Sequence, residues 1–131
     1  MTSEQAMAIA GMNHFTILTD DVPRTVRFYA DLFGLAEGFR PNLNFPGAWL
    51  YAGERAVLHV VGGRSRAELR AGVIDHVAFS ATGLADTLAK LTAHGIQHIC
   101  RQQVGSGVWQ VFIHDPNGAR VELDFAADEV R

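Results

Sequence analysis

Two pairs of residues with metal-binding side chains repeat along the chain at nearly the same spacing. His14 and His76 are 62 residues apart, and His59 and Glu122 are 63 residues apart. Imidazole and carboxylate groups bind divalent ions, and they also accept and donate protons in catalysis. The spacing therefore predicts one module written twice, with a metal-capable residue at two matching places in each copy.

The segments around these residues have the composition of β-strands followed by a helix. Residues 11–18 and 73–80 are rich in apolar residues without a helical period. Each is followed by a helical pattern that ends at a glycine, Gly34 or Gly95. Further strands are predicted at 35–40, 48–51, 56–61, 96–101, 108–114 and 119–125. The sequence thus predicts an α+β protein of two tandem βαβββ modules.

The length and the glycine positions suggest one domain with a short internal linker. We predict a single domain over residues 1–131, with a first module at 11–61 and a second at 73–126. The linker at 62–72 contains adjacent glycines and three arginines, with a helical turn expected at 67–70. The turn at 115–118, Asp-Pro-Asn-Gly, fits a type I turn, and the acidic tail at 128–129 is expected to be frayed.

Strand alternation predicts which side chains share a face with the four metal-capable residues. In the last strand, Val121, Leu123 and Phe125 should face the helices, so Glu122 should point to the opposite, concave face. A concave face on which polar groups converge is typical of a ligand site. The substrate-pocket residues that we predict there are Trp49, Tyr51, Gln110 and Phe112.

Composition excludes several other classes of protein. The net charge is −3 and the chain has no basic run, which argues against nucleic-acid binding. No apolar run is long enough to span a membrane, and the first ten residues lack the features of a signal peptide. The single cysteine, Cys100, suits a reducing compartment. We therefore expect a cytoplasmic protein whose partner is a small-molecule substrate.

Several motifs resemble those of the vicinal oxygen chelate superfamily, which includes glyoxalase I, extradiol dioxygenases, fosfomycin-modifying enzymes and bleomycin-binding proteins. The likeness runs from Met12 to Phe125, and the motifs that carry it are His14, Arg27-Phe28-Tyr29, Leu32-Phe33-Gly34-Leu35, Asp75-His76-Val77-Ala78-Phe79, Asp115-Pro116-Asn117-Gly118 and Val121-Glu122-Leu123. The resemblance implies the glyoxalase/dioxygenase-like fold, in which paired modules form incomplete barrels around a divalent metal ion. It also implies that His14, His76 and Glu122 are the ligands, and that a substrate with two adjacent oxygens fills open positions on the ion.

His59 is the main departure from one branch of that superfamily. Glyoxalase I usually carries a glutamate ligand there, whereas extradiol dioxygenases carry an acid or base histidine in the matching region. Phe112 argues against the dioxygenase branch, because those dioxygenases tend to have a tyrosine at its place. His59 is thus predicted to be either a fourth ligand or an uncoordinated acid or base, with Glu122 as the other catalytic residue.

Three functions follow from these features. The sequence favours an extradiol-dioxygenase-like enzyme that uses Fe(II), since a neutral site with His59 suits that ion. The alternative is a glyoxalase I-like lyase or isomerase that uses Zn²⁺ or Ni²⁺, and Mn²⁺ also fits the donor set. A non-catalytic drug- or metabolite-binding protein is the third possibility, although such a protein does not need the ligands.

The resemblance also bears on assembly. Small relatives commonly pair modules across two chains, which predicts a homodimer with metal sites between modules. His14 and His59 would then come from one chain, and His76 and Glu122 from the other. The 11-residue linker is long enough for pairing within one chain as well, so its reach does not decide between the two arrangements.

Overall fold

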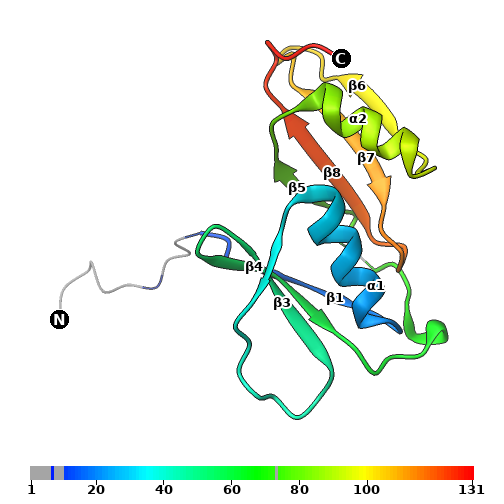
Figure 1. The fold of residues 1–131 in the computed structure, drawn as a ribbon. Coiled ribbons are helices and arrows are strands. Elements are labelled where there is room, and N and C mark those ends of the chain that lie inside the picture. Colours follow the sequence, from blue (N-terminus) through cyan, green and yellow to red (C-terminus); the bar gives the residue numbers. More distant parts are fainter. Residues whose placement is uncertain (1–6, 8–10, 73) are drawn as a thin grey trace.

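The computed structural model describes residues 7, 11–72 and 74–131. It contains two four-stranded sheets, each with a helical segment on one side, as Figure 1 shows. The first module comprises β1 (Phe15–Leu18), α1 (Val22–Arg27), η2 (Phe28–Leu32), β2 (Ala36–Gly38), β3 (Gly47–Ala52) and β4 (Arg55–Val61). The second comprises β5 (Val77–Ser80), α2 (Leu84–Ala93), β6 (Ile99–Gln102), β7 (Trp109–His114) and β8 (Arg120–Phe125), and the short helix η3 (Arg66–Glu68) lies between the modules.

The two sheets have the same strand order, which confirms the predicted α+β fold of two βαβββ modules. The orders are β1-β4-β3-β2 and β5-β8-β7-β6, with the outer pairs β1–β4 and β5–β8 parallel and the other pairs antiparallel. Thr16 pairs with His59, and Ala78 pairs with Glu122. His59 and Glu122 therefore occupy equivalent positions, and His14 and His76 each lie one residue before their strand.

The first helix begins as its sequence predicts but changes form near its end. The side chain of Asp21 accepts a hydrogen bond from the Arg24 amide at 3.1 Å, so Asp21 caps the helix. From Phe28 the helix widens into a π-helix, which the residue pattern does not predict. Gly34 follows with a φ of 76°, and Gly95 ends α2 with a φ of 66°, which confirms both predicted stops.

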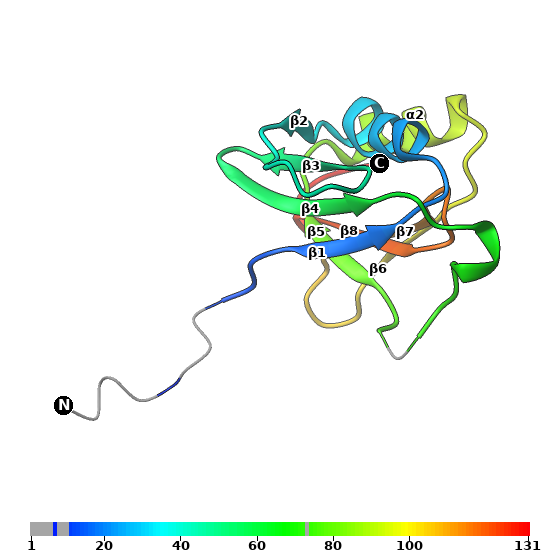
Figure 2. The ribbon, with the colours of Figure 1, turned by 90° about the horizontal axis from the view of Figure 1, so that it is seen from below.

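The helices lie together on one side of the two sheets (Figure 2). One buried cluster joins Leu50 and Leu58 of the first sheet to Val121 and Leu123 of the second and to Tyr29 of η2. Strand alternation therefore operates as predicted, because the helix-facing side chains of β8 are buried in this cluster. The metal-capable residues lie on the opposite faces, which the helices leave uncovered.

A polar network links the two modules at their junction. The hydroxyl of Tyr29 donates to Asp115 at 2.8 Å, and the hydroxyl of Thr19 donates to the side chain of Asn117 at 2.7 Å. The side-chain amide of Asn117 in turn donates to the hydroxyl of Thr25 at 2.9 Å. The turn at 115–118 is therefore also the joint that holds the first module against the second.

Some local expectations differ from the structure. Residues 96–98 precede β6 rather than forming part of it. The tail is not frayed, because the Glu129 carboxylate accepts hydrogen bonds from the amides of Gly83 and Leu84, at 3.1 and 2.7 Å, and caps α2. Among the helices of the described residues, none has the length and apolarity needed to cross a membrane.

Candidate metal centre

The first half of the candidate site lies on the helix-free face of β1, β4 and β3. The Nδ1 of His14 donates to the side-chain oxygen of Asn13 at 2.7 Å, which leaves the Nε2 lone pair free. The ring of His59 stacks on that of His14 with centroids 3.7 Å apart. The ring of Trp49 covers the other side of His59, with centroids 4.0 Å apart. This half-site presents imidazole nitrogens within an aromatic stack.

The second half repeats this arrangement with a carboxylate in place of the second imidazole. The Nδ1 of His76 donates to Asp75 at 2.7 Å, and its Nε2 lies 3.1 Å from the Oε1 of Glu122. The Glu122 side chain is only 8% exposed, and its Oε2 accepts a hydrogen bond from Gln110 at 3.1 Å. Gln110 therefore fixes one carboxylate oxygen of Glu122 and leaves the other beside His76.

The surroundings shift three pKa values in the two half-sites. Burial lowers the pKa of His59, and the neighbouring His14 lowers it further, so His59 is neutral at neutral pH. Burial and the nearby Glu122 carboxyl raise the pKa of Asp124 to about 6. The hydrogen bond from His76, together with that from Arg120, lowers the pKa of Asp75. Asp75 is therefore ionised when it orients His76.

One chain does not bring the four predicted ligands together. His14 and His59 adjoin each other in the first module, and His76 and Glu122 adjoin each other in the second. Within residues 7, 11–72 and 74–131, no three His, Cys, Asp or Glu side chains are grouped closely enough to hold an ion. Each module thus brings two of the four predicted ligands together on its uncovered face.

The predicted pocket residues divide between the two modules. Trp49 and Phe112 occupy equivalent positions, because each pairs across the sheet with a predicted site residue, His59 or Glu122. The hydroxyl of Tyr51 donates to the carbonyl of Phe39 at 2.7 Å, so it anchors the loop after β2.

Phe112 differs from Trp49 in its neighbours. The guanidinium groups of Arg101 and Arg120 lie 5.0 and 4.7 Å from the centre of its ring. The centre of its ring lies 6.4 Å from that of His76, and the two ring planes are 83° apart, so the contact is edge to face.

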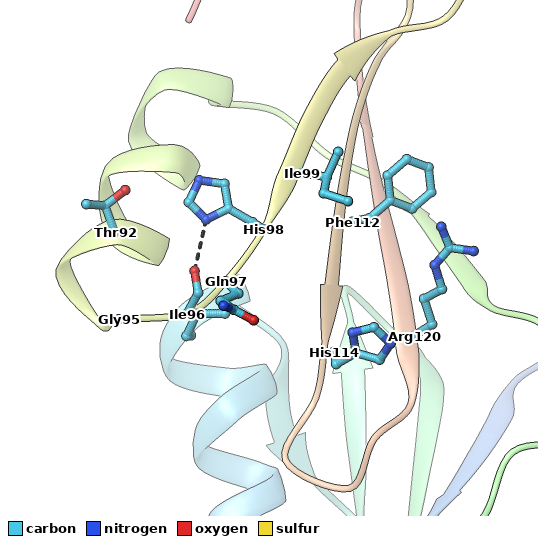
Figure 3. A pocket seen from close by; sticks show the side chains of 9 residues that line it. All are labelled: Thr92, Gly95, Ile96, Gln97, His98, Ile99, Phe112, His114 and Arg120. Carbon is cyan, nitrogen blue, oxygen red and sulfur yellow. Dashed lines mark hydrogen bonds between the residues drawn. The ribbon is translucent and has the colours of Figure 1, made fainter.

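A hollow of about 730 Å³ opens at the edge of the second sheet, where β6 begins (Figure 3). Phe112, His114 and Arg120 line it from β7 and β8, and residues 95–99 line it from the loop after α2 and the start of β6. His98 turns towards that loop and donates to the carbonyl of Ile96 at 2.9 Å. The hollow includes Phe112, the cross-strand neighbour of Glu122, but neither His76 nor Glu122 lines it.

Sequence reasoning missed the residues that orient the two histidines. Asn13 and Asp75 are 62 residues apart, which is also the separation of His14 and His76. An acceptor side chain directly before each histidine was therefore a visible signal of the repeat. Such partners fix the tautomer and the direction of a metal-binding imidazole. Asp124 was missed as well, since on the sequence alone it was only another residue on the face of Glu122.

Comparisons with known proteins agree with the fold and the order of the motifs. The family model of the Glyoxalase/Bleomycin resistance protein/Dioxygenase superfamily matches residues 11–123. A protein of Arabidopsis thaliana named Glyoxylase I 4 is 28% identical over 123 residues, and the match covers 88% of this chain and 70% of that protein.

Solved structures share the fold at lower identity. A Bacillus anthracis protein described as belonging to the glyoxalase family has a TM-score of 0.76 at 20% identity, and the match covers 93% of this chain and 99% of that one. A variant of the fosfomycin resistance protein FosX from Listeria monocytogenes, in complex with Mn(II) and 1S,2S-dihydroxypropylphosphonic acid, has a TM-score of 0.74 at 17% identity. That match covers 91% of this chain and 94% of the FosX chain.

Proposed function

The chain belongs to the Glyoxalase/Bleomycin resistance protein/Dioxygenase superfamily, and from this membership we propose that it is a metal-dependent enzyme for substrates with two adjacent oxygens. The ligands in this proposal are His14, His76 and Glu122. The observation that carries it is the paired geometry of the half-sites. Each histidine is held through Nδ1 by the residue before it, and in the second module the free Nε2 lies 3.1 Å from a carboxylate oxygen.

The donor set fits a divalent ion. Two donors that each lie about 2.1 Å from an ion, at a right angle, are about 3.0 Å from each other. The separation of 3.1 Å between His76 Nε2 and Glu122 Oε1 matches that value. Two imidazoles and one carboxylate leave positions open on the ion, which would polarise the bound oxygens of the substrate as a Lewis acid.

We propose that the complete site forms between two chains. The helices lie on one side of both sheets, so the two half-sites lie on the uncovered faces of the same chain (Figure 2). A second copy facing these surfaces would place His14 and His59 of one chain opposite His76 and Glu122 of the other. A two-fold axis would then create two equivalent sites. Sedimentation of a metal-loaded, fully active monomer would contradict this arrangement.

For the reaction, we propose first a glyoxalase-like isomerisation of an α-hydroxy carbonyl adduct. The relative named Glyoxylase I 4 supports this choice over the dioxygenase that the sequence alone favoured. His59 would take a proton from one carbon and return it to the next, because its lowered pKa keeps a ring nitrogen unprotonated near neutral pH. Gln110 would hold the Glu122 carboxylate in place during this transfer.

An Fe(II) dioxygenase acting on a catechol-like diol is the second candidate. The observation that favours it is His59 itself, because an imidazole at this position leaves the site less negative than a second glutamate would.

Metal content and substrate turnover together test these proposals. Protein purified without added metal should contain zinc or nickel and convert the hemithioacetal of a 2-oxoaldehyde with a small thiol. Stoichiometric iron with oxygen-dependent cleavage of a catechol would replace the first candidate by the second. A protein without metal that binds but does not convert either compound would be the non-catalytic binding protein, and the proposal would be wrong.

A further inference from the structure

Three aromatic rings form a continuous stack on the uncovered face of the first sheet. The ring of His59 lies between His14 and Trp49, with interplanar angles of 14° and 10°. Trp49 stands directly opposite His59 in the β3–β4 ladder, so the contact follows from strand register. Both faces of the His59 imidazole are covered, and only its edge is free to meet a substrate or an ion.

The stack limits how His14 and His59 can bind metal. An imidazole binds an ion through a lone pair that lies in the plane of the ring. The two ring planes are nearly parallel, with centroids 3.7 Å apart, so they do not meet near the ring edges. An ion in the plane of one ring would lie farther from the other plane than the roughly 2.0–2.1 Å of a zinc–nitrogen bond. One ion can therefore be bound by only one of these two histidines while the stack persists.

The hydrogen bonds assign that role to His14. Asn13 holds the Nδ1 of His14 in the same way that Asp75 holds the Nδ1 of His76, at 2.7 Å in both cases. His14 is thus the member of the stack whose Nδ1 is held by the side chain of the preceding residue, and it occupies the position equivalent to His76.

We infer that Trp49 is a positioning residue, which clamps His59 against His14 so that His59 stays uncoordinated and keeps its ring edge free for proton transfer. This inference rests on the proposed function, since it concerns which residues bind the ion. It changes the role that the sequence suggested for Trp49, from lining the substrate pocket to fixing the orientation of an acid or base.

The second module shows that the clamp is a feature of the first. Phe112 is the counterpart of Trp49, but it meets His76 edge-on, at 83°, rather than face to face. The guanidinium groups of two arginines lie over its ring instead. Phe112 therefore serves as a matched control for Trp49.

Nitrogen-15 NMR of the imidazole rings, with Zn²⁺ alone as the probe, tests this inference. In the unsubstituted protein, the Nε2 signals of His14 and His76 should move to metal-bound positions, while both nitrogens of His59 stay at unbound positions. Before metal is added, the ring protons of His59 should show the upfield ring-current shift of a stacked ring. Trp49→Leu should reduce that shift, because the larger of the two stacked rings is lost, and allow the His59 nitrogens to respond to Zn²⁺.

Two further variants separate stacking from a general effect on folding. Trp49→Phe retains a ring and should keep His59 shifted upfield and unresponsive to Zn²⁺, and Phe112→Leu should leave the His59 signals unchanged. The inference is wrong if His59 moves to a metal-bound position in the unsubstituted protein, or if Trp49→Leu leaves its ring signals in place. If neither His14 nor His76 responds to Zn²⁺, the proposed metal site is wrong, and the metal-free spectra still decide whether Trp49 orients His59.

Discussion

The two modules build their half-sites on the same backbone, but with different chemistry. In the first, His59 lies in a stack with His14 and Trp49, and no carboxylate takes part. In the second, Glu122 occupies the equivalent position and lies between His76 and Gln110. One strand position thus separates a neutral half-site from a charged one, which teaches that a duplicated scaffold can hold chemically different side chains at equivalent positions.

The residues that orient the two histidines also differ in charge between the modules. His14 is held by the neutral amide of Asn13, whereas His76 is held by the ionised carboxylate of Asp75. A carboxylate partner raises the basicity of an imidazole more than an amide does. The second module should therefore bind the ion more strongly than the first.

The largest effect is expected from loss of a ligand in the charged half-site. Glu122→Gln and His76→Ala should each weaken Zn²⁺ binding by more than about 100-fold, beyond the 10–100-fold typical of outer contacts. Competition with a chromogenic chelator measures the affinity. His98→Ala is the control, since its ring contacts the loop after α2 and it should retain full affinity. Normal Zn²⁺ affinity in Glu122→Gln would remove the charged half-site from the proposal.

Loss of His59, in the neutral half-site, should reduce turnover rather than metal binding. His59→Ala should retain most of its metal and lose about 10²–10⁴-fold in turnover, as is usual for a general acid or base. Metal analysis and a steady-state assay on the same preparation measure both quantities. If His59→Ala empties the site, then His59 is a ligand, and the contrast between the two modules is smaller than we describe.

The orienting residues should have intermediate effects that differ between modules. Asp75→Ala should weaken metal binding by about 10–100-fold, and Asn13→Ala should weaken it less, because only Asp75 carries charge. Asp75→Asn gives the second half-site the amide of the first. Its loss of metal affinity should fall between those of Asp75→Ala and Asn13→Ala. Equal losses for Asp75→Ala and Asn13→Ala would show that orientation matters and charge does not.

The smallest effect concerns stability. Asp124 has a pKa raised from 3.8 to about 6, so ionising it disfavours the folded state, and this cost appears as the pH rises through that interval. Asp124→Asn should therefore raise the unfolding free energy of metal-free protein by about 1–2 kcal/mol at pH 7, less than the ~3 kcal/mol that the whole pKa shift corresponds to, because solvent screens the partly exposed group, and change it little at pH 3.5. Urea titrations at the two pH values measure this difference, and an equal effect at both would argue against the raised pKa.

Sequence could predict the parts of this architecture that depend on periodicity. The separations of 62 and 63 residues place His59 and Glu122 in equivalent registers, because strand pairing repeats with the module. The helix stops at Gly34 and Gly95 were predictable, because a positive φ favours glycine.

Contacts between distant segments were beyond sequence reasoning. Trp49 was predicted to line a pocket, and nothing in its local sequence indicates that it stacks on His59 across a strand pair. The Glu129 carboxylate caps α2 through two amides that lie 45 and 46 positions earlier in the chain. No periodic signal in the sequence marks this contact. The turn at 115–118 was predicted as a turn, but its bond to Thr19 depends on how the modules pack.

Mixing two defective chains tests the central claim most directly. His14→Ala and His76→Ala each remove a ligand from every shared site, so each variant alone should bind almost no Zn²⁺. When equal amounts are refolded together, mixed dimers should contain one intact site, which restores about a quarter of all sites by random pairing. Zn²⁺ bound per chain, measured after gel filtration, should therefore rise well above the value for either variant. A mixture that binds no more Zn²⁺ than its separate components would contradict the shared metal centre.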